Sequence, residues 1–211
     1  MYYETCGAGR PLILLHGNGE THRIFDKAIP LLSARYTVYA IDSRGHGLSD
    51  AAACYHYDDM KEDVRCFIAA LGLVKPALYG FSDGGIIGLL LACDDPSLLS
   101  ALIVSGANTS PQGIRDGWRR FFVRLNGRLH DAKMDMMLRE PHITGEMLQR
   151  IKAPTLVLAG GHDMVKRADT AFIAANIPGS SMRIMRMHGH GSYIVHKKKI
   201  AELILDFLAD Q

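Results

Sequence analysis

The chain has 211 residues, a formal net charge of +2, 48% apolar residues and 22% charged residues. This length provides one substantial core and is short for two domains. The weak net charge favours neither nucleic acid nor an anionic membrane as a partner, and no apolar stretch reaches the roughly 18 residues of a membrane helix. No signal-peptide pattern and no CxxC pair are present, so we expect no nucleic-acid or membrane partner and a cytoplasmic location.

Short apolar runs bounded by glycine and turn residues alternate with longer segments of helical period. The predicted strands cover residues 11–15, 36–41, 77–79, 101–104, 155–159 and 182–187. The predicted helices cover residues 58–71, 85–93 and 200–208. Strands that alternate with helices in this way are typical of an α/β fold, in which a mostly parallel sheet is flanked by helices on both faces.

The segment from residue 108 to about residue 152 breaks this alternation. It is rich in aromatic residues, arginine and methionine and contains no obvious strand. We predict a short helical cap insertion over the sheet, within a single domain that spans residues 1–211, because the segment is too short for a core of its own. Its large apolar residues either line a pocket or attach the cap to the sheet, and both interpretations stay open: Trp118, Phe121, Phe122, Met134, Met136 and Met137.

Ser82 lies in the sequence Gly-Phe-Ser-Asp-Gly-Gly, between a predicted strand and a predicted helix. This is the context that the G-x-S-x-G nucleophile elbow requires. The glycines make room for a tight turn that lifts the hydroxyl clear of the sheet, and the N-terminus of the following helix favours a developing oxyanion. The alternative is a glycine-rich turn that happens to contain a serine.

A serine hydroxyl is a weak nucleophile and needs a base near it. His190 follows the last predicted strand, and we prefer it to His188, which is expected to point back toward the sheet. Asp163 follows the predicted strand 155–159 and is the carboxylate expected to orient the imidazole. Another interpretation makes His162, Asp163, His188 and His190 metal ligands, but no paired zinc spacing such as HExxH is present. We therefore predict neither a metal nor another cofactor.

Two backbone N–H groups are expected to bind a developing negative charge on the substrate. The sequence His-Gly-Asn-Gly at residues 16–19 ends the first predicted strand, and its glycines allow the backbone to approach a ligand. We predict that the donors are the N–H groups of Asn18 and Asp83, because the residue after the nucleophile supplies one donor of such a site.

Over essentially its whole length the chain resembles the α/β-hydrolase superfamily. The segments that carry the resemblance are residues 16–19, 42–49, 80–85, 158–163, 189–190 and 204–208. The resemblance implies the α/β-hydrolase fold, a triad of Ser82, His190 and Asp163, and a structural role for the 42–49 loop. A serine at position 82 argues against the haloalkane dehalogenase and epoxide hydrolase branches, which use aspartate. The Ser-Asp-Gly-Gly elbow looks like that of valacyclovirase-like hydrolases.

These residues predict a serine hydrolase that cleaves a small carboxylic ester, thioester or lactone through an acyl-Ser82 intermediate. The expected partner is a small ester-type substrate. The alternative is a ligand-sensing signalling protein on the same fold, in which hydrolysis is slow. The side chain of Asp83 has two open roles: it attracts a cationic group of the substrate, or it stabilises the start of its helix.

Overall fold

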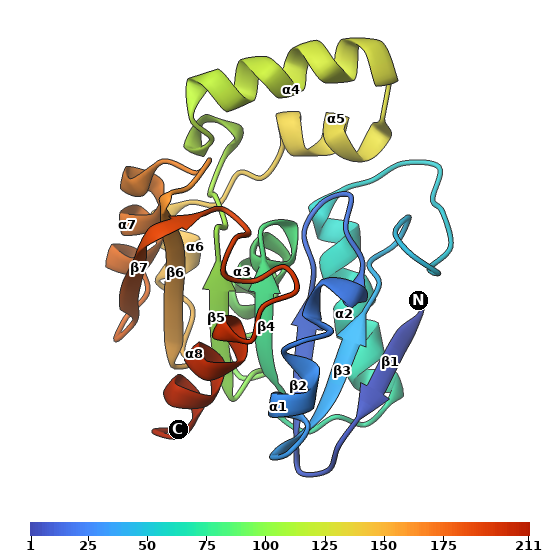
Figure 1. Cartoon of the computed structure of the whole chain (residues 1–211), viewed down its shortest axis with the longest axis vertical. Coiled ribbons are helices and arrows are strands. Elements are labelled where there is room, and N and C mark those ends of the chain that lie inside the picture. The colour runs from blue at the N-terminus through green and yellow to red at the C-terminus, as the bar shows by residue number, and fades with distance from the viewer.

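The computed structural model describes all residues from 1 to 211 and contains one seven-stranded sheet (Figure 1). The strands are β1 (Tyr3–Cys6), β2 (Arg10–Leu15), β3 (Tyr36–Ile41), β4 (Ala77–Phe81), β5 (Ala101–Ser105), β6 (Thr155–His162) and β7 (Ser181–Gly189). Their order in the sheet is β1-β3-β2-β4-β5-β6-β7. β1 is antiparallel to β3 and all other neighbouring pairs are parallel. The predicted mostly parallel sheet is confirmed, and so is each of the six predicted strands.

The degree of burial explains which strands could be predicted from the sequence. Every residue of β4 and β5 is buried, as expected for central parallel strands with helices on both faces. β1 was not predicted because it is an edge strand of four residues with three of them exposed, so it has no apolar run.

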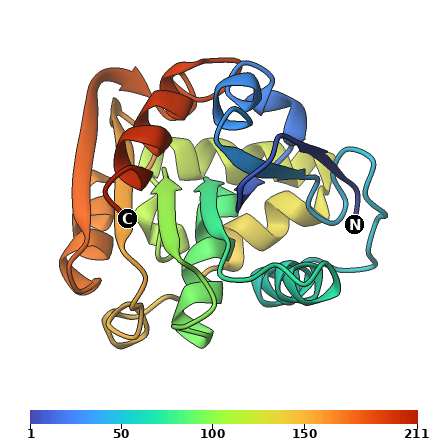
Figure 2. The same ribbon diagram turned by 90° about the horizontal axis from the view of Figure 1, so that it is seen from below.

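Helices cover both faces of the sheet (Figure 2). α1 (Ile29–Leu32) and α8 (Lys199–Leu208) contribute to a core of 23 buried residues on one face. α2 (Tyr57–Ala70), α3 (Asp83–Asp94) and α7 (Arg167–Asn176) contribute to a core of 29 buried residues on the other. The three predicted helices correspond to α2, α3 and α8. α7 was not predicted, because only Thr170 and Ile173 of this helix are buried and its apolar face is narrow.

Two antiparallel helices lie across the end of the sheet at which the central parallel strands terminate (Figure 1). They are α4 (Asp116–Leu129) and α5 (Ala132–Arg139), and they are flanked by the short helices η2 (Pro111–Gly113) and α6 (Gly145–Leu148). Asp131 caps the N-terminus of α5, and its carboxylate accepts from the N–H groups of Lys133 and Met134. The fold thus places helices where the cap was expected; the division of the chain into one domain with a cap stays a prediction. The other short helix is η1 (His22–Phe25), and every helix is too short or too polar to cross a lipid bilayer.

Candidate active site

Ser82 occupies a one-residue turn between the end of β4 and the start of α3. Its φ of 53° and ψ of −115° are uncommon for a residue with a side chain. The flanking glycines are required by close backbone contacts: a Cβ atom on Gly80 would lie 2.2 Å from the carbonyl oxygen of Gly84, and one on Gly84 would lie 2.4 Å from that of Leu15. The packing of β4, α3 and β2 therefore holds the serine in this conformation.

The structure brings the three side chains of the predicted triad together. Asp163 lies just after β6, and His190 lies in the loop after β7. His190 Nε2 is 3.0 Å from Ser82 Oγ, and His190 Nδ1 is 2.6 Å from Asp163 Oδ1. Because a carboxylate only accepts hydrogen bonds, Nδ1 carries a proton and donates a hydrogen bond to Asp163. Nε2 is then free to accept from the serine hydroxyl.

Asp163 is almost completely buried, and its surroundings stabilise the ionised carboxylate. Its exposed fraction is 2%, and its two oxygens also accept from the N–H groups of Gly160 and Val165 at 3.0 Å each. Burial raises the pKa of such a carboxyl, but the hydrogen bond and charge of His190, with the two N–H groups, lower the pKa of Asp163 below its usual value overall. Asp163 is therefore ionised at neutral pH and fixes the orientation of the imidazole.

Two neighbours of the imidazole were not predicted. A Cβ atom on Gly106, at the end of β5, would lie 2.7 Å from His190 Cε1, so only glycine leaves room for the ring. Phe81 packs on the ring with centroids 4.9 Å apart. The position of Gly106 directly after an apolar run could have been noticed in the sequence. Its contact with His190 could not, because the two residues are distant along the chain.

The rival histidines lie outside this hydrogen-bonded chain. His188 Nδ1 is 3.2 Å from Ser192 Oγ and its ring packs on Tyr193, while His162 is exposed. No group of three histidine, cysteine or acidic side chains has the arrangement of a metal site. His190, the histidine that the sequence favoured, is the one that contacts both Ser82 and Asp163.

The loop at residues 16–19 lies beside Ser82, and its N–H groups differ in availability. The N–H of Gly17 donates to Glu20 Oε2 at 3.0 Å, and that of Gly19 donates to His46 Nε2 at 3.1 Å. The N–H of Asn18 has no acceptor within the protein. Asp83 is the first residue of α3, so its N–H has no acceptor within the helix. The two predicted donors are thus free for a ligand.

The carboxylate of Asp83 is buried, and both of its oxygens accept hydrogen bonds from other side chains. Its exposed fraction is 3%; one oxygen accepts from Tyr57 Oη at 2.8 Å and the other from Asn18 Nδ2 at 2.9 Å. Burial raises the pKa of Asp83, and these two donors oppose that effect. The same Asn18 amide donates to the carbonyl of Lys133 at 3.2 Å. Asp83 thereby ties the 16–19 loop to α2, and Asn18 ties it to α5.

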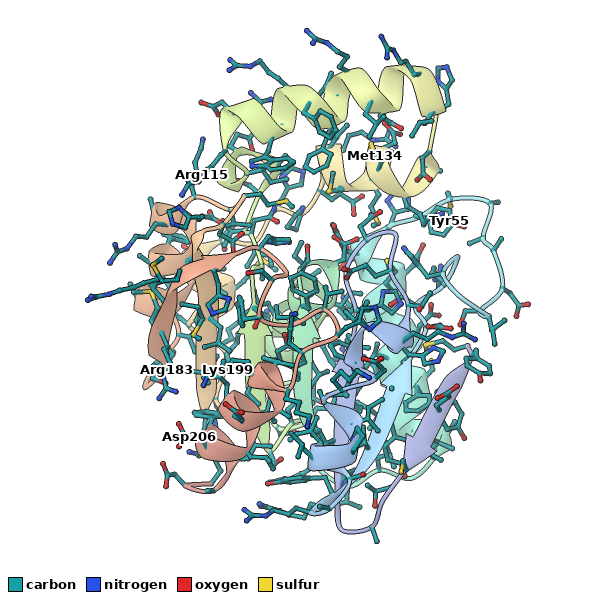
Figure 3. The ribbon with its side chains drawn as sticks, in the orientation of Figure 1. Tyr55, Arg115, Met134, Arg183, Lys199 and Asp206 are labelled. Atoms are coloured by element: carbon teal, nitrogen blue, oxygen red, sulfur yellow. The ribbon has the colours of Figure 1, made fainter.

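A cavity of about 330 Å³ lies next to Ser82, between the sheet and the helices α4 and α5. Its walls near the sheet are formed by Gly17, Asn18, Gly19, Glu20, Phe81, Ser82, Met164 and His190, and its walls from the cap segment by Phe122, Asp131, Lys133, Met134 and Met137. Three of the six large apolar residues considered above therefore line the cavity, and Figure 3 shows Met134 on α5 over the sheet. Met136 is buried in the core instead, and Trp118 and Phe121 are exposed.

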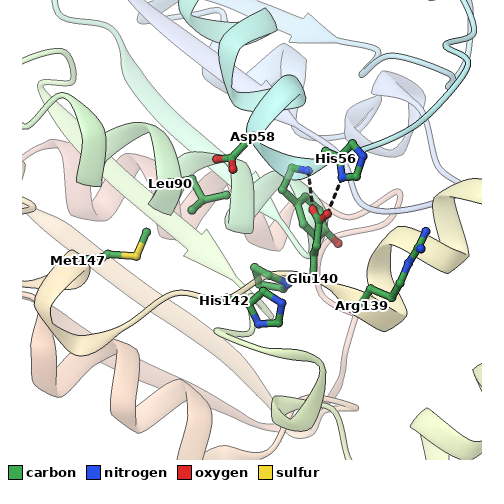
Figure 4. Close-up of a pocket in the computed structure, with 9 residues that line it drawn as sticks. His56, Asp58, Leu90, Arg139, Glu140, His142 and Met147 are labelled. Carbon is green, nitrogen blue, oxygen red and sulfur yellow. Dashed lines mark hydrogen bonds and ion pairs between the residues drawn. The ribbon is translucent and has the colours of Figure 1, made fainter.

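A second cavity, of about 370 Å³, lies between α2 and the segment that joins α5 to α6 (Figure 4). Glu140 spans it: one carboxylate oxygen is 2.6 Å from His56 Nδ1, and the other accepts from the N–H of Tyr57 at 3.0 Å. The hydrogen bond to Glu140 raises the pKa of His56. None of the predicted site residues lines this cavity, and we assign Glu140 the structural role of attaching the start of α2 to the cap segment.

The His16 side chain connects the 16–19 loop to Ser43. We expect its titration to make the stability of the protein depend on pH. Its Nδ1 is 2.7 Å from the carbonyl of Gly17, and its Nε2 accepts from the N–H of Ser43 at 3.1 Å. Burial lowers the pKa of His16 to about 4, whereas an unfolded histidine titrates near 6.5. Between these values the unfolded chain binds a proton that the folded chain does not, so stability falls as the pH falls.

We expect His16 alone to reduce the free energy of unfolding by about 2 kcal/mol between pH 7 and pH 4.5. Urea denaturation across this range measures the effect. His16→Gln should flatten the pH dependence by that amount, and His162→Gln, a substitution at an exposed histidine, is the matched control. Equal pH dependence in wild type and His16→Gln would contradict the assignment.

Comparison with known proteins identifies relatives of the chain and of its fold. Residues 10–133 match the family model described as alpha/beta hydrolase fold. The chain is 28% identical to the AB hydrolase superfamily protein YisY of Bacillus subtilis, with 98% of this chain and 94% of the relative covered. It is also 28% identical to the human serine hydrolase BPHL, with 99% of this chain and 82% of the relative covered.

Solved structures show the same fold. An esterase from Exiguobacterium antarcticum superposes with a TM-score of 0.86 at 24% identity and covers 99% of this chain and 95% of its own. The enol-lactonase from Burkholderia xenovorans superposes with a TM-score of 0.81 at 18% identity and covers 99% and 96%.

Proposed function

Because the chain belongs to the alpha/beta hydrolase fold family, we propose that it is a serine hydrolase that cleaves a small carboxylic ester, thioester or lactone. One observation carries the proposal. His190 makes hydrogen bonds to both Ser82 and Asp163, and this chain of contacts opens into the cavity below α4 and α5. The similarity to a protein named as a serine hydrolase over 99% of the chain supports the same conclusion.

In the proposed acylation step, Ser82 Oγ attacks the carbonyl carbon of the substrate. His190 Nε2 takes the hydroxyl proton as the new C–O bond forms, and ionised Asp163 stabilises the resulting imidazolium. The carbonyl oxygen becomes an oxyanion, and the free N–H groups of Asn18 and Asp83 are its proposed donors. When the tetrahedral intermediate collapses, His190 returns the proton to the departing alcohol or thiol, and Ser82 remains acylated.

Deacylation repeats these steps with water. His190 accepts a proton from a water molecule, whose oxygen attacks the acyl carbon, and the second tetrahedral intermediate uses the same two N–H groups. Its collapse breaks the bond to Ser82 Oγ, which recovers its proton from His190. The products are a carboxylic acid and regenerated Ser82.

The cavity supports a small substrate with an apolar part. Its volume of about 330 Å³ is at the lower end of the range for small-molecule sites. Phe122, Met134, Met137 and Met164 provide apolar walls, and methionine adapts its shape to different acyl groups. Both oxygens of Asp83 already accept hydrogen bonds from Tyr57 and Asn18, which favours its structural role over contact with a cationic substrate group.

Labelling with a fluorophosphonate probe tests the proposal. The probe forms a covalent bond with activated serines, so we expect one adduct per chain, on the peptide that contains Ser82. Ser82→Ala should abolish the adduct, and prior incubation with a hydrolysable ester from a screened library should slow labelling of the wild type. An adduct on another serine, or none on a folded wild-type protein, would refute the assignment of the nucleophile.

A further inference from the structure

Basic residues outnumber acidic ones on α4 and at Arg115, which directly precedes it. Residues 115–129 contain five arginines and one aspartate, although the whole chain has a net charge of only +2. The rest of the chain is therefore net negative. None of these arginines forms an ion pair or a side-chain hydrogen bond: Arg115, Arg119, Arg120, Arg124 and Arg128.

The apolar face of the same helix is only partly covered by the rest of the protein. α4 contains no buried residue. Trp118 is 46% exposed, Phe121 is 52% exposed and Leu129 is 60% exposed. Large apolar side chains that cluster on a surface mark a binding site more often than scattered ones do.

The two kinds of residue occupy different sides of α4. Arg120, Arg124 and Arg128 are spaced four residues apart and form one stripe along the helix. Trp118, Phe121, Phe122, Leu125 and Leu129 follow the same rule on another side. Side chains with nitrogen at their tips project from the outer side of α4, away from the sheet (Figure 3). A helix with basic and apolar sides is typical of segments that lie in the interface of a membrane.

The exposed aromatic cluster continues into the cavity above Ser82. Trp118 stacks on Phe122 with centroids 5.9 Å apart and an interplanar angle of 28°, and Phe121 packs against both rings. Phe122 is itself a wall of the cavity. A partner that covers this cluster would therefore lie at the edge of the active site.

We propose that α4 docks the protein on an anionic lipid surface. Phosphate groups of the lipids complement the unpaired guanidinium groups, and the apolar boundary below the headgroups accommodates Trp118 and Phe121. The aromatic rings pack against one another rather than standing apart as stacking platforms for bases, which favours lipid over single-stranded nucleic acid. The weak net charge of the whole chain predicted no membrane partner, because a net charge does not show that arginines cluster on one helix.

Trp118 is the only tryptophan of the chain, so its fluorescence reports directly on α4. The probes are vesicles of phosphatidylcholine alone and vesicles in which one third of the lipid is phosphatidylglycerol. With the anionic vesicles we expect a blue shift of the emission, which should weaken as the salt concentration rises from about 50 mM to about 500 mM. Phosphatidylcholine alone should produce no shift.

A matched pair of variants makes the test specific. Arg120→Glu/Arg124→Glu should weaken binding to the anionic vesicles by at least about tenfold. Lys197→Glu/Lys198→Glu changes the charge equally at two exposed lysines without ion pairs before α8 and should bind like the wild type. Neither pair lines the cavity, so hydrolysis of a water-soluble ester should stay unchanged, which also reports correct folding. The inference does not depend on the chemistry of Ser82.

Four outcomes would overturn the proposal. The first is no shift with either kind of vesicle, and the second is an equal shift with both. The third is equal weakening by the two pairs of substitutions, which would indicate attraction by overall charge rather than by α4. A single-stranded oligonucleotide that displaces the protein from the anionic vesicles at equal phosphate concentration would assign the surface to nucleic acid instead.

Discussion

Replacing Ser82 with alanine is expected to lower kcat/KM for a short-chain chromogenic ester by about 10⁴-fold or more. The substitution removes the only hydroxyl within hydrogen-bond distance of His190 Nε2, and with it the acyl-enzyme route. The free N–H groups of Asn18 and Asp83 remain, so a small residual activity above the uncatalysed rate is expected. Steady-state kinetics with active-site titration of the wild type measures the change.

Ser105→Ala is the matched control. Ser105 is buried at the end of β5, next to β4, and its carbonyl accepts from the N–H of Ser82 at 2.8 Å. Its hydroxyl takes no part in the proposed steps, so activity should stay within a few-fold of wild type. Activity of Ser82→Ala within tenfold of wild type, in a protein with an unchanged melting temperature, would rule out the proposed nucleophile.

Asp163→Asn is expected to lower kcat by about 10⁴-fold with little change in KM. In the wild type Asp163 Oδ1 accepts a hydrogen bond from the Nδ1–H group of His190, with 2.6 Å between the two atoms, and this leaves Nε2 without a proton. An asparagine amide can donate to Nδ1 instead, and this selects the tautomer whose Nε2 carries the proton and cannot accept one from Ser82. The loss should appear in kcat because the cavity walls that bind the substrate are unchanged.

Asp169→Asn is the control for removing a partly buried carboxylate. Asp169 accepts from the hydroxyl and the N–H of Thr109 and has no hydrogen bond to Ser82 or His190. This variant should lose some stability and keep its turnover. Comparable losses of kcat in the two variants would show that Asp163 acts through general stability rather than through the orientation of His190.

Three local patterns made much of the fold and the candidate site predictable. Apolar runs that stop at glycine or a polar residue indicated β2 to β7, because buried parallel strands contain almost no polar residues. The Gly-Phe-Ser-Asp-Gly-Gly turn indicated Ser82, since only glycine tolerates the close contacts at positions 80 and 84. Residues that directly follow strands β6 and β7 indicated Asp163 and His190, because parallel strands bring their carboxyl ends to one edge.

The features that were not predicted depend on contacts between distant segments. Gly106 makes room for His190, and Asp83 binds Tyr57 and Asn18. No local spacing encodes these contacts, which link residues that are 26 to 84 positions apart. The edge strand β1 was missed for a different reason: it buries little apolar surface and therefore shows no pattern.

The sequence by itself determined which residues make up the proposed serine hydrolase site and at which edge of the sheet they meet. Residue type, strand boundaries and glycine turns are local properties, and the parallel sheet then brings the strand ends together. Only the tertiary structure decided which partners occupy the N–H groups of Gly17 and Gly19, which cap residues line the cavity and where the arginines stay unpaired. These properties depend on which atoms of other segments come within hydrogen-bond or van der Waals distance, and that is defined only once the chain has folded.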